Sequence, residues 1–241
     1  MEVKKMKIVI LHGSPKGEKS VTMQYVKFIQ KKNPDHEYMV HNVSKRIKQL
    51  EKNHRLFADI IEDIDASDGI IWSFPVYTYF VPAQYIKFIE LIQERGAAKA
   101  FKHKYTVAIS TSIHFYDYTA HRYINAVCDD LDMNYAGFHS AEMDDLLNAG
   151  DRKTLLQFAD MFFYAIKNKV HCLKKFQPLQ QNNFDFRLEE PTRQVDSNDK
   201  KVIVLTDNDD PGSNIGKMIQ RFTSSFKKKP TVINLNTIDI K

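Results

Sequence analysis

The sequence contains few cysteines and no long hydrophobic run. Its two cysteines, Cys128 and Cys172, cannot build a disulfide framework or hold an iron–sulfur cluster, which needs about four thiolates. The most apolar stretch, residues 69–82, is too short to cross a bilayer and contains two prolines. An apolar signal-peptide region is also missing near the first residue. We therefore expect a cytoplasmic protein with reduced thiols and no membrane partner.

The composition is that of a folded domain. Hydrophobic residues make up 43% of the 241 residues and aromatic residues 12%, which argues against disorder. The net charge of +5 is concentrated early, because residues 1–60 hold 13 Lys and Arg against 6 Asp and Glu. A basic first unit suits an anionic ligand, including nucleic acid. These cations are scattered over predicted helix faces without interleaved aromatics, however, so we expect a solvated surface and no nucleic-acid partner.

Strand and helix patterns alternate along the first 170 residues. Short β-branched runs predict five strands, and apolar residues at helical spacing predict the helices between them. The predicted strands are 7–11, 38–43, 69–74, 105–110 and 134–138, and the helices are 21–29, 56–64, 82–96, 121–131 and 151–170. Short connections and right-handed crossovers favour a doubly wound α/β fold with a parallel sheet in the order 2-1-3-4-5.

The end of the chain repeats the pattern of its beginning. We predict a first domain over residues 1–176 and a polar linker over 177–200. A second α/β unit over 201–241 follows, with strand, Gly/Ser turn, helix and strand in the order seen in 7–43. Two strands and one helix bury too little to fold alone, so we expect this unit to be the start of a longer one or to pack on the first domain.

The turn after the first strand is rich in small and hydroxyl residues. It precedes a helix N-terminus, where free backbone N–H groups and the helix dipole attract an anion. Ser14, Ser20 and Thr22 can donate hydroxyl hydrogen bonds, and Lys16 adds positive charge. This pattern indicates a site for a phosphomonoester. The alternative is an ordinary strand–helix turn capped by Ser20.

Two other phosphate motifs fit this turn poorly. A P-loop would need glycine where Glu18 stands between Gly13 and the pair Lys19-Ser20, and no acidic residue follows the third strand to hold magnesium. The Gly-x-Gly-x-x-Gly fingerprint of dinucleotide-binding folds is absent.

The loop after the third strand is aromatic and nearly uncharged. Residues 72–84 include Tyr77, Tyr79 and Phe80 at the carboxyl end of a strand. Such rings are unusual on a surface loop unless something flat or apolar covers them. A flavin ring would do so, and a homodimer interface or local core filling are alternatives that remain compatible with it.

These two loops together resemble the NAD(P)H-dependent FMN reductase family of the flavodoxin-like superfamily. The resemblance rests on residues 12–15, Ser20 and Thr22, then residues 74–77 and 81–84, and it covers about residues 5–170. It implies FMN as cofactor and NAD(P)H as hydride donor. The residues it implies for the cofactor are Ser14, Lys16, Ser20, Val21 and Thr22 around the phosphate, Pro75, Val76, Tyr77 and Tyr79 at the ring, and Thr111 and Ser112 in a third loop.

The third loop follows the fourth strand and departs from the family after Ser112. Relatives continue with glycines, whereas this chain has Ile113, His114 and Phe115. His114 could bond the pyrimidine edge of a flavin, or be a surface-loop histidine. His114, Asp117 and His121 would share a helix face, but no fourth ligand is identifiable, and we expect no metal.

The resemblance implies an oxidoreductase that passes hydride from NAD(P)H to a quinone, a flavin or another small electrophile. The cofactor carries this chemistry, so no side chain is required as an acid or base. Tyr77, Tyr79 and His114 are the candidates for shaping the substrate face. The alternatives are a flavodoxin-like electron carrier, which tends to be more acidic and compact, and a degenerate interaction domain that no longer binds FMN.

Overall fold

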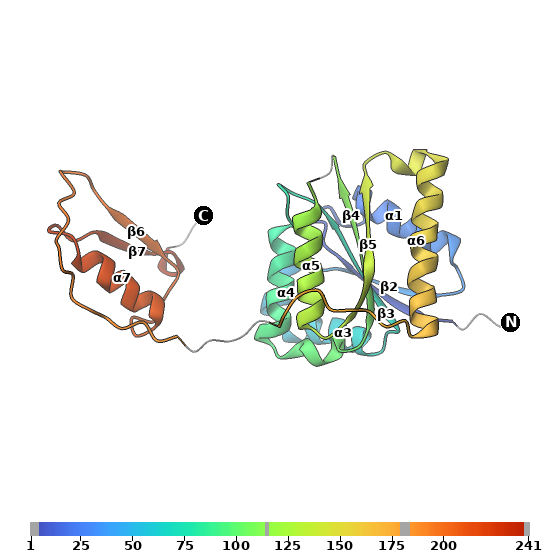
Figure 1. Ribbon diagram of the computed structural model, residues 1–241, viewed down its shortest axis with the longest axis horizontal. Coiled ribbons are helices and arrows are strands. Elements are labelled where there is room, and N and C mark those ends of the chain that lie inside the picture. Colours follow the sequence, from blue (N-terminus) through green and yellow to red (C-terminus); the bar gives the residue numbers. More distant parts are fainter. Residues whose placement is uncertain (1–4, 114–115, 179–183, 239–241) are drawn as a thin grey trace. The chain divides into compact units, whose positions relative to one another are not determined.

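The chain folds into two compact units. The computed structural model describes residues 5–113, 116–178 and 184–238. Unit 1 spans Met1–Leu179 and unit 2 spans Gln180–Lys241, and each is described by itself (Figure 1). The domain limits expected from the sequence, with a linker at 177–200, remain a proposal. Within the described ranges, no helix combines the length and the apolar character needed to cross a membrane.

Unit 1 is built on a five-stranded sheet whose paired strands all run parallel, in the order β2-β1-β3-β4-β5. The doubly wound, flavodoxin-like fold class predicted from the sequence is therefore confirmed. The strands are β1 (Lys7–His12), β2 (Glu37–Asn42), β3 (Gly69–Pro75), β4 (Tyr105–Ser112) and β5 (Asn134–Glu142). The direction of winding reverses between β1 and β3, so the carboxyl ends of these strands form the switch point where ligands of such sheets bind.

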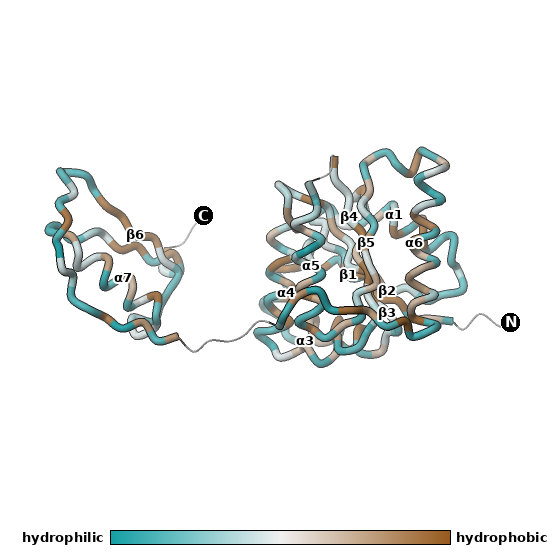
Figure 2. Tube along the Cα trace, in the orientation of Figure 1, coloured by the Kyte–Doolittle hydropathy of each residue, from teal (hydrophilic) through white to brown (hydrophobic). Residues whose placement is uncertain are grey.

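Helices cover both faces of this sheet (Figure 1). One face carries α1 (Val21–Lys32) and α6 (Ala149–Asn168), and the other carries α2 (Ile47–Lys52), α3 (His54–Asp65), α4 (Ala83–Glu94) and α5 (Tyr118–Asp130). The sequence pattern missed the short α2, placed the start of α5 three residues late, and ended β5 at Phe138. Figure 2 shows the apolar strands of the sheet between helices whose outer surfaces are more hydrophilic.

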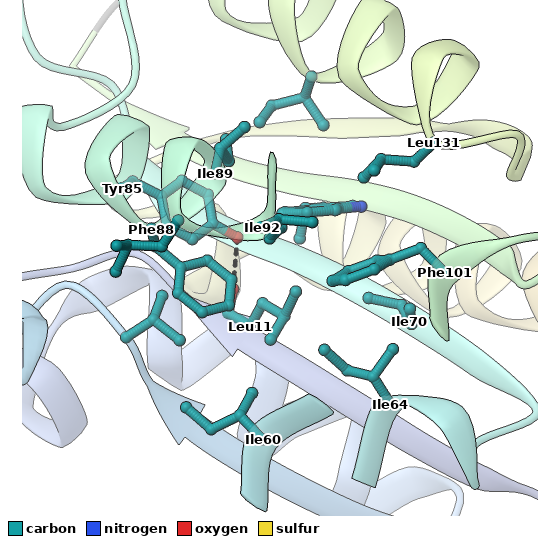
Figure 3. Packing of buried hydrophobic residues seen from close by; sticks show 14 of the residues in the cluster. Leu11, Ile60, Ile64, Ile70, Tyr85, Phe88, Ile89, Ile92, Phe101 and Leu131 are labelled. Carbon is teal, nitrogen blue, oxygen red and sulfur yellow. Dashed lines mark hydrogen bonds between the residues drawn. The ribbon is translucent and has the colours of Figure 1, made fainter. Parts of the chain in front are cut away.

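The core on the α4 side fixes the start of the first functional loop. Tyr85 is fully buried and its hydroxyl donates a hydrogen bond of 2.6 Å to the carbonyl oxygen of Leu11 (Figure 3). Trp72 stacks on Phe101 with ring centroids 6.0 Å apart. A Cβ atom at Gly13 would lie 2.8 Å from the Tyr85 ring, so only glycine allows the chain to leave β1 at this point.

The edge strand β5 contains a bulge. Thr106 of β4 pairs with Tyr135, and the next residue, Val107, pairs with Gly137, which leaves Ala136 as an extra residue. Gly137 has a φ of +138°, a conformation that favours glycine. Beyond the bulge, Phe138 stacks on His121 of α5, with ring centroids 4.0 Å apart.

Unit 2 is a small parallel β-α-β arrangement. It consists of β6 (Ile203–Thr206), α7 (Asn214–Ser224) and β7 (Thr231–Asn234). The order strand, turn, helix and strand follows the sequence pattern. Residues before β6 pack on this unit as well, because the N–H of Val195 donates to the carbonyl of Ser225 at 2.6 Å.

Candidate functional site

A cleft of about 230 Å³ opens at the carboxyl edge of the sheet, between the loops that follow β1, β3 and β4. We call it the edge cleft. Ten of the eleven binding residues predicted from the sequence line it: Ser14, Lys16, Ser20, Val21, Thr22, Pro75, Val76, Tyr77, Thr111 and Ser112. The eleventh, Tyr79, lies outside the lining, and Ile113 and Met143 complete it. The structure therefore brings the three predicted loops to one place.

A buried histidine holds the first loop in position. The Nδ1 of His12 lies 3.1 Å from the Ser73 hydroxyl, and its Nε2 lies 2.9 Å from Ser20 Oγ and 3.3 Å from the Gly17 carbonyl. Because a carbonyl only accepts, Nε2 carries the proton and Nδ1 accepts from Ser73. Burial lowers the pKa of His12 to about 4, so the ring is neutral near neutral pH.

This arrangement leaves the Ser20 hydroxyl free to donate. Ser20 caps α1 by accepting a 3.2 Å hydrogen bond from the N–H of Met23, and it also accepts from His12. With both lone pairs engaged, its own O–H is available to an acceptor in the edge cleft. The N–H groups of Val21 and Thr22 belong to the first turn of α1 and have no intrahelical acceptor. Several donors therefore converge at this end of the cleft.

Glu18 does not contribute negative charge to the cleft lining. Its carboxylate pairs with Lys27 at 2.9 Å and accepts from Asn42 at 3.2 Å, on the outer side of the turn. These contacts lower the pKa of Glu18. Lys16 lines the cleft whereas Lys19 does not. The lysine at the cleft is therefore not Lys19, the residue that stands at the P-loop lysine position.

The loop after β3 contains a strained turn. The N–H and carbonyl groups of Tyr77 and Phe80 exchange hydrogen bonds of 2.8 and 3.1 Å around Thr78 and Tyr79. These two central residues have φ values of +48° and +69°, which normally select Asn or Gly. Tyr79 is 55% exposed and makes an edge-to-face contact with Tyr116. The turn thus holds an aromatic rim beside the cleft at a cost in backbone energy.

The loop after β4 carries a second polar cluster. His121 Nε2 lies 2.9 Å from Ser110 Oγ and 3.2 Å from the carboxylate of Asp117, which also accepts from Ser140. Burial lowers the pKa of His121 to about 4 despite this carboxylate. Within the described chain no group of three or more His, Cys, Asp or Glu side chains could hold a metal ion. His114, a candidate from the sequence, lies outside the described residues.

Sequence reasoning missed three contributors. His12 enters the sequence analysis only as part of the family motif. A polar residue at the end of a buried strand, directly before a glycine, nevertheless indicates a buried side chain that is hydrogen-bonded. Ile113 lines the cleft while 71% exposed, and Met143 reaches it from beyond β5. No local pattern predicts Met143, because its place depends on the length of β5.

The donor set of the edge cleft suits a phosphomonoester beside an apolar ring. Hydroxyls, helix N–H groups and Lys16 lie at one end, and Pro75, Val76 and Tyr77 lie at the other. A doubly wound parallel sheet with such a cleft at its switch point defines a flavodoxin-like protein. The chain belongs to the NADPH-dependent FMN reductase family, whose profile matches residues 6–129.

Comparison with solved structures agrees with the fold. The apo form of an NADH:FMN oxidoreductase (EMOB) is 13% identical with a TM-score of 0.56, over 67% of this chain and 90% of that one. An oxidoreductase from Corynebacterium diphtheriae is 15% identical with a TM-score of 0.53, over 68% of this chain and 97% of that one. No curated protein matches the sequence significantly. The family consists of FMN-dependent oxidoreductases.

Proposed function

We propose that this chain binds FMN in the edge cleft and uses it to reduce a quinone, a free flavin or another small electrophile with NAD(P)H. The observation that carries the proposal is the convergence of ten predicted cofactor residues on one cleft at the switch point of the sheet. Membership of the FMN reductase family supports it, as does the activity for which the NADH:FMN oxidoreductase with the same fold is named.

The phosphate end of FMN would lie against the turn between β1 and α1. Ser20 and Thr22 offer buried hydroxyls, and Ser14 offers a third at the start of the turn. Lys16 adds a charge that can approach from the open side. Backbone N–H groups at the start of α1 complete a donor set for a dianion.

The ring of FMN would lie against Pro75, Val76 and Tyr77. When bound, FMN supplies the redox chemistry between the nicotinamide and the electron acceptor. The chain positions the reactants and excludes water. Tyr77 and Tyr79 are about half exposed, at 46% and 55%, so they are suited to flank a planar substrate beside the cofactor. Only Lys16 and Tyr77 among the described lining residues are titratable, which supports a role in positioning rather than in proton transfer.

A matched pair of lysine variants tests the cofactor site. Lys16→Gln should weaken FMN binding about tenfold, because a charge-assisted contact to phosphate is lost. Lys19→Gln changes the same charge three residues away, outside the cleft lining, and should leave binding unchanged. Quenching of FMN fluorescence during titration of the purified protein measures both. Equal effects of the two substitutions would contradict the proposed site.

Anaerobic addition of NADPH or NADH to the FMN-loaded protein tests the reaction. Bleaching of the visible flavin band, followed by recovery when a quinone is added, is the expected result. Binding of FMN without bleaching would favour an electron carrier.

One observation favours the rival interaction domain. The edge cleft is smaller than the roughly 300–1,000 Å³ typical of ligand sites, and Ile113 stands where relatives have small residues. A purified protein that is colourless and does not quench FMN fluorescence would establish that rival.

We also propose a cytoplasmic homodimer. The exposed rim formed by Tyr77, Tyr79, Tyr116 and Tyr118 is apolar surface that a second copy would cover. Light scattering after size exclusion measures the mass. A monomer at tens of micromolar would exclude the dimer.

A further inference from the structure

A second and larger cavity lies beside α5, away from the residues of the edge cleft. It has a volume of about 740 Å³ and is bounded by α5, the edge strand β5 and the segment 173–176. It shares no lining residue with the edge cleft. We call it the α5–β5 cavity. None of the residues assigned to FMN contributes to it, so its purpose is not explained by the proposed function.

The segment after α6 forms a fixed wall of this cavity. Figure 1 shows the chain leaving α6 and crossing β5 toward α5. The backbone N–H groups of Lys175 and Phe176 both donate to one carboxylate oxygen of Asp129, at 2.8 and 2.9 Å. Lys174 also pairs with Asp132 at 2.5 Å. This segment is therefore anchored to the end of α5 and its following loop.

Aromatic rings face the cavity from two sides. Phe138 of β5 is 51% exposed and stacks on His121 with an interplanar angle of 24°. Phe176 of the segment 173–176 also lines the cavity, and the guanidinium carbon of Arg122 lies 5.9 Å from its ring centroid. Such walls are suited to a planar ring, which gains stacking and apolar burial together.

Two cations line the same cavity. Arg122 and Lys175 are both exposed, and neither forms an ion pair with any residue in the described ranges. The carboxylate of Asp129, at the end of α5, already accepts two backbone hydrogen bonds. The lining therefore offers positive charge that no carboxylate of the described residues neutralises, which suits a carboxylate on the ligand.

A buried histidine nitrogen supplies the third element of recognition. His121 is 3% exposed, and its Nε2 carries a proton because it faces the carboxylate of Asp117. Its Nδ1 is therefore an acceptor, and it has no hydrogen-bond partner in the described part of the chain. A buried acceptor without a donor costs free energy. A hydroxyl group on a ligand would satisfy it.

We propose that the α5–β5 cavity binds a planar aromatic acid that also carries a hydroxyl group. The ring would lie between Phe138 and Phe176. The carboxylate would face Arg122 and Lys175, and the hydroxyl would donate to His121 Nδ1. The site is independent of FMN, so it stands even if the edge cleft proves empty of cofactor.

Calorimetric titration of the whole chain with a hydroxynaphthoate, whose hydroxyl and carboxylate lie at opposite ends of the two rings, tests this site. The double variant Arg122→Gln/Lys175→Gln should lose affinity at least about tenfold. The matched double variant Lys153→Gln/Lys167→Gln removes two exposed charges from α6 and should bind as the unchanged protein does. Saturation with FMN should leave the affinity unchanged.

Ligand analogues test each contact without altering the fold. The corresponding naphthoate without a hydroxyl should bind several-fold more weakly, and the uncharged hydroxynaphthamide should bind about tenfold more weakly. The proposal is wrong if no binding occurs up to millimolar concentration. It is also wrong if FMN displaces the ligand, or if the Arg122/Lys175 and Lys153/Lys167 double variants behave alike.

Discussion

The hydroxyl oxygens of Thr22 and Thr111 lie 2.5 Å apart, although the two residues are 89 positions apart in the sequence. Thr22 is in the first turn of α1 and Thr111 is near the end of β4, and both are buried. This hydrogen bond joins the first and third loops of the edge cleft. Because Thr22 is held in α1 and Thr111 in β4, the width of the edge cleft is set by the folded sheet and not by the conformation of either loop.

A double-mutant cycle on this pair should show strong coupling. Thr22→Val and Thr111→Val each leave one buried hydroxyl without its partner, so we expect a coupling free energy of about 1 kcal/mol. Urea unfolding followed by Trp72 fluorescence measures it, because Trp72 is the single tryptophan and is buried in unit 1. Additive losses would show that the two hydroxyls do not interact.

Loss of the Ser20 hydroxyl should affect both stability and ligand binding. Ser20→Ala removes the N-cap of α1, which costs about 1 kcal/mol, and removes a proposed donor to phosphate. Ser213→Ala removes the equivalent cap of α7 in unit 2 and is the matched control. Only Ser20→Ala should shift the Trp72 transition and weaken FMN binding. A shift of that transition by Ser213→Ala would contradict the separation of the two units.

Relief of the strained turn after β3 should stabilise unit 1. Thr78 has a β-branched side chain at a φ of +48°, and asparagine tolerates that conformation better. Thr78→Asn should therefore raise the free energy of unfolding by about 0.5–1 kcal/mol. Thr78→Val keeps the branched side chain and should give no gain. Chemical denaturation with Trp72 as the reporter distinguishes the two.

Stability should fall on acidification because His12 is buried as a neutral ring. Its folded-state pKa of about 4 lies below the ordinary histidine value of 6.5, so the unfolded chain binds a proton that the folded chain does not. The contribution is fully present above about pH 6.5 and is lost as the pH falls toward 4. Between about pH 7.5 and 5, linkage predicts a loss of about 2 kcal/mol from His12.

His121, whose pKa is also lowered to about 4, should add a similar loss. His12→Asn should remove the His12 part of the pH dependence seen by Trp72 fluorescence. The rest should persist, because burial lowers the pKa values of His36, His41 and His139 as well. An unchanged pH profile in that variant would show that His12 is not the titrating group.

The sheet could be predicted from the sequence because its signals are local. β-branched runs such as residues 7–11 mark strands covered on both faces, and short connections leave few ways to order them. The short α2 escaped because six residues are too few for a periodic pattern. The end of β5 escaped because residues 139–142 are His, Ser, Ala and Glu, with no β-branched or large apolar side chain to mark a strand.

The edge cleft was predictable in its residues but not in its shape. Ser20 and Thr22 stand out because hydroxyls at the start of a helix can cap it or donate to an anion. Tyr79 was grouped with Tyr77, but the tight turn between Tyr77 and Phe80 turns it out of the lining. The α5–β5 cavity had no sequence signal, since its walls come from α5, β5 and the segment 173–176, which meet only in the fold.

The extra residue in β5 decides which side chains line the α5–β5 cavity. Tyr135 and Phe138 both face α5, although they are three positions apart, while His139 packs on Phe158 of α6. A regular strand alternates its side chains, so residues three positions apart face opposite sides, and the extra residue is what brings both rings to the α5 face. If Ala136 were deleted, the two rings would be two positions apart and would still share that face, so a related chain one residue shorter here would keep both walls of the cavity beside a straight edge strand.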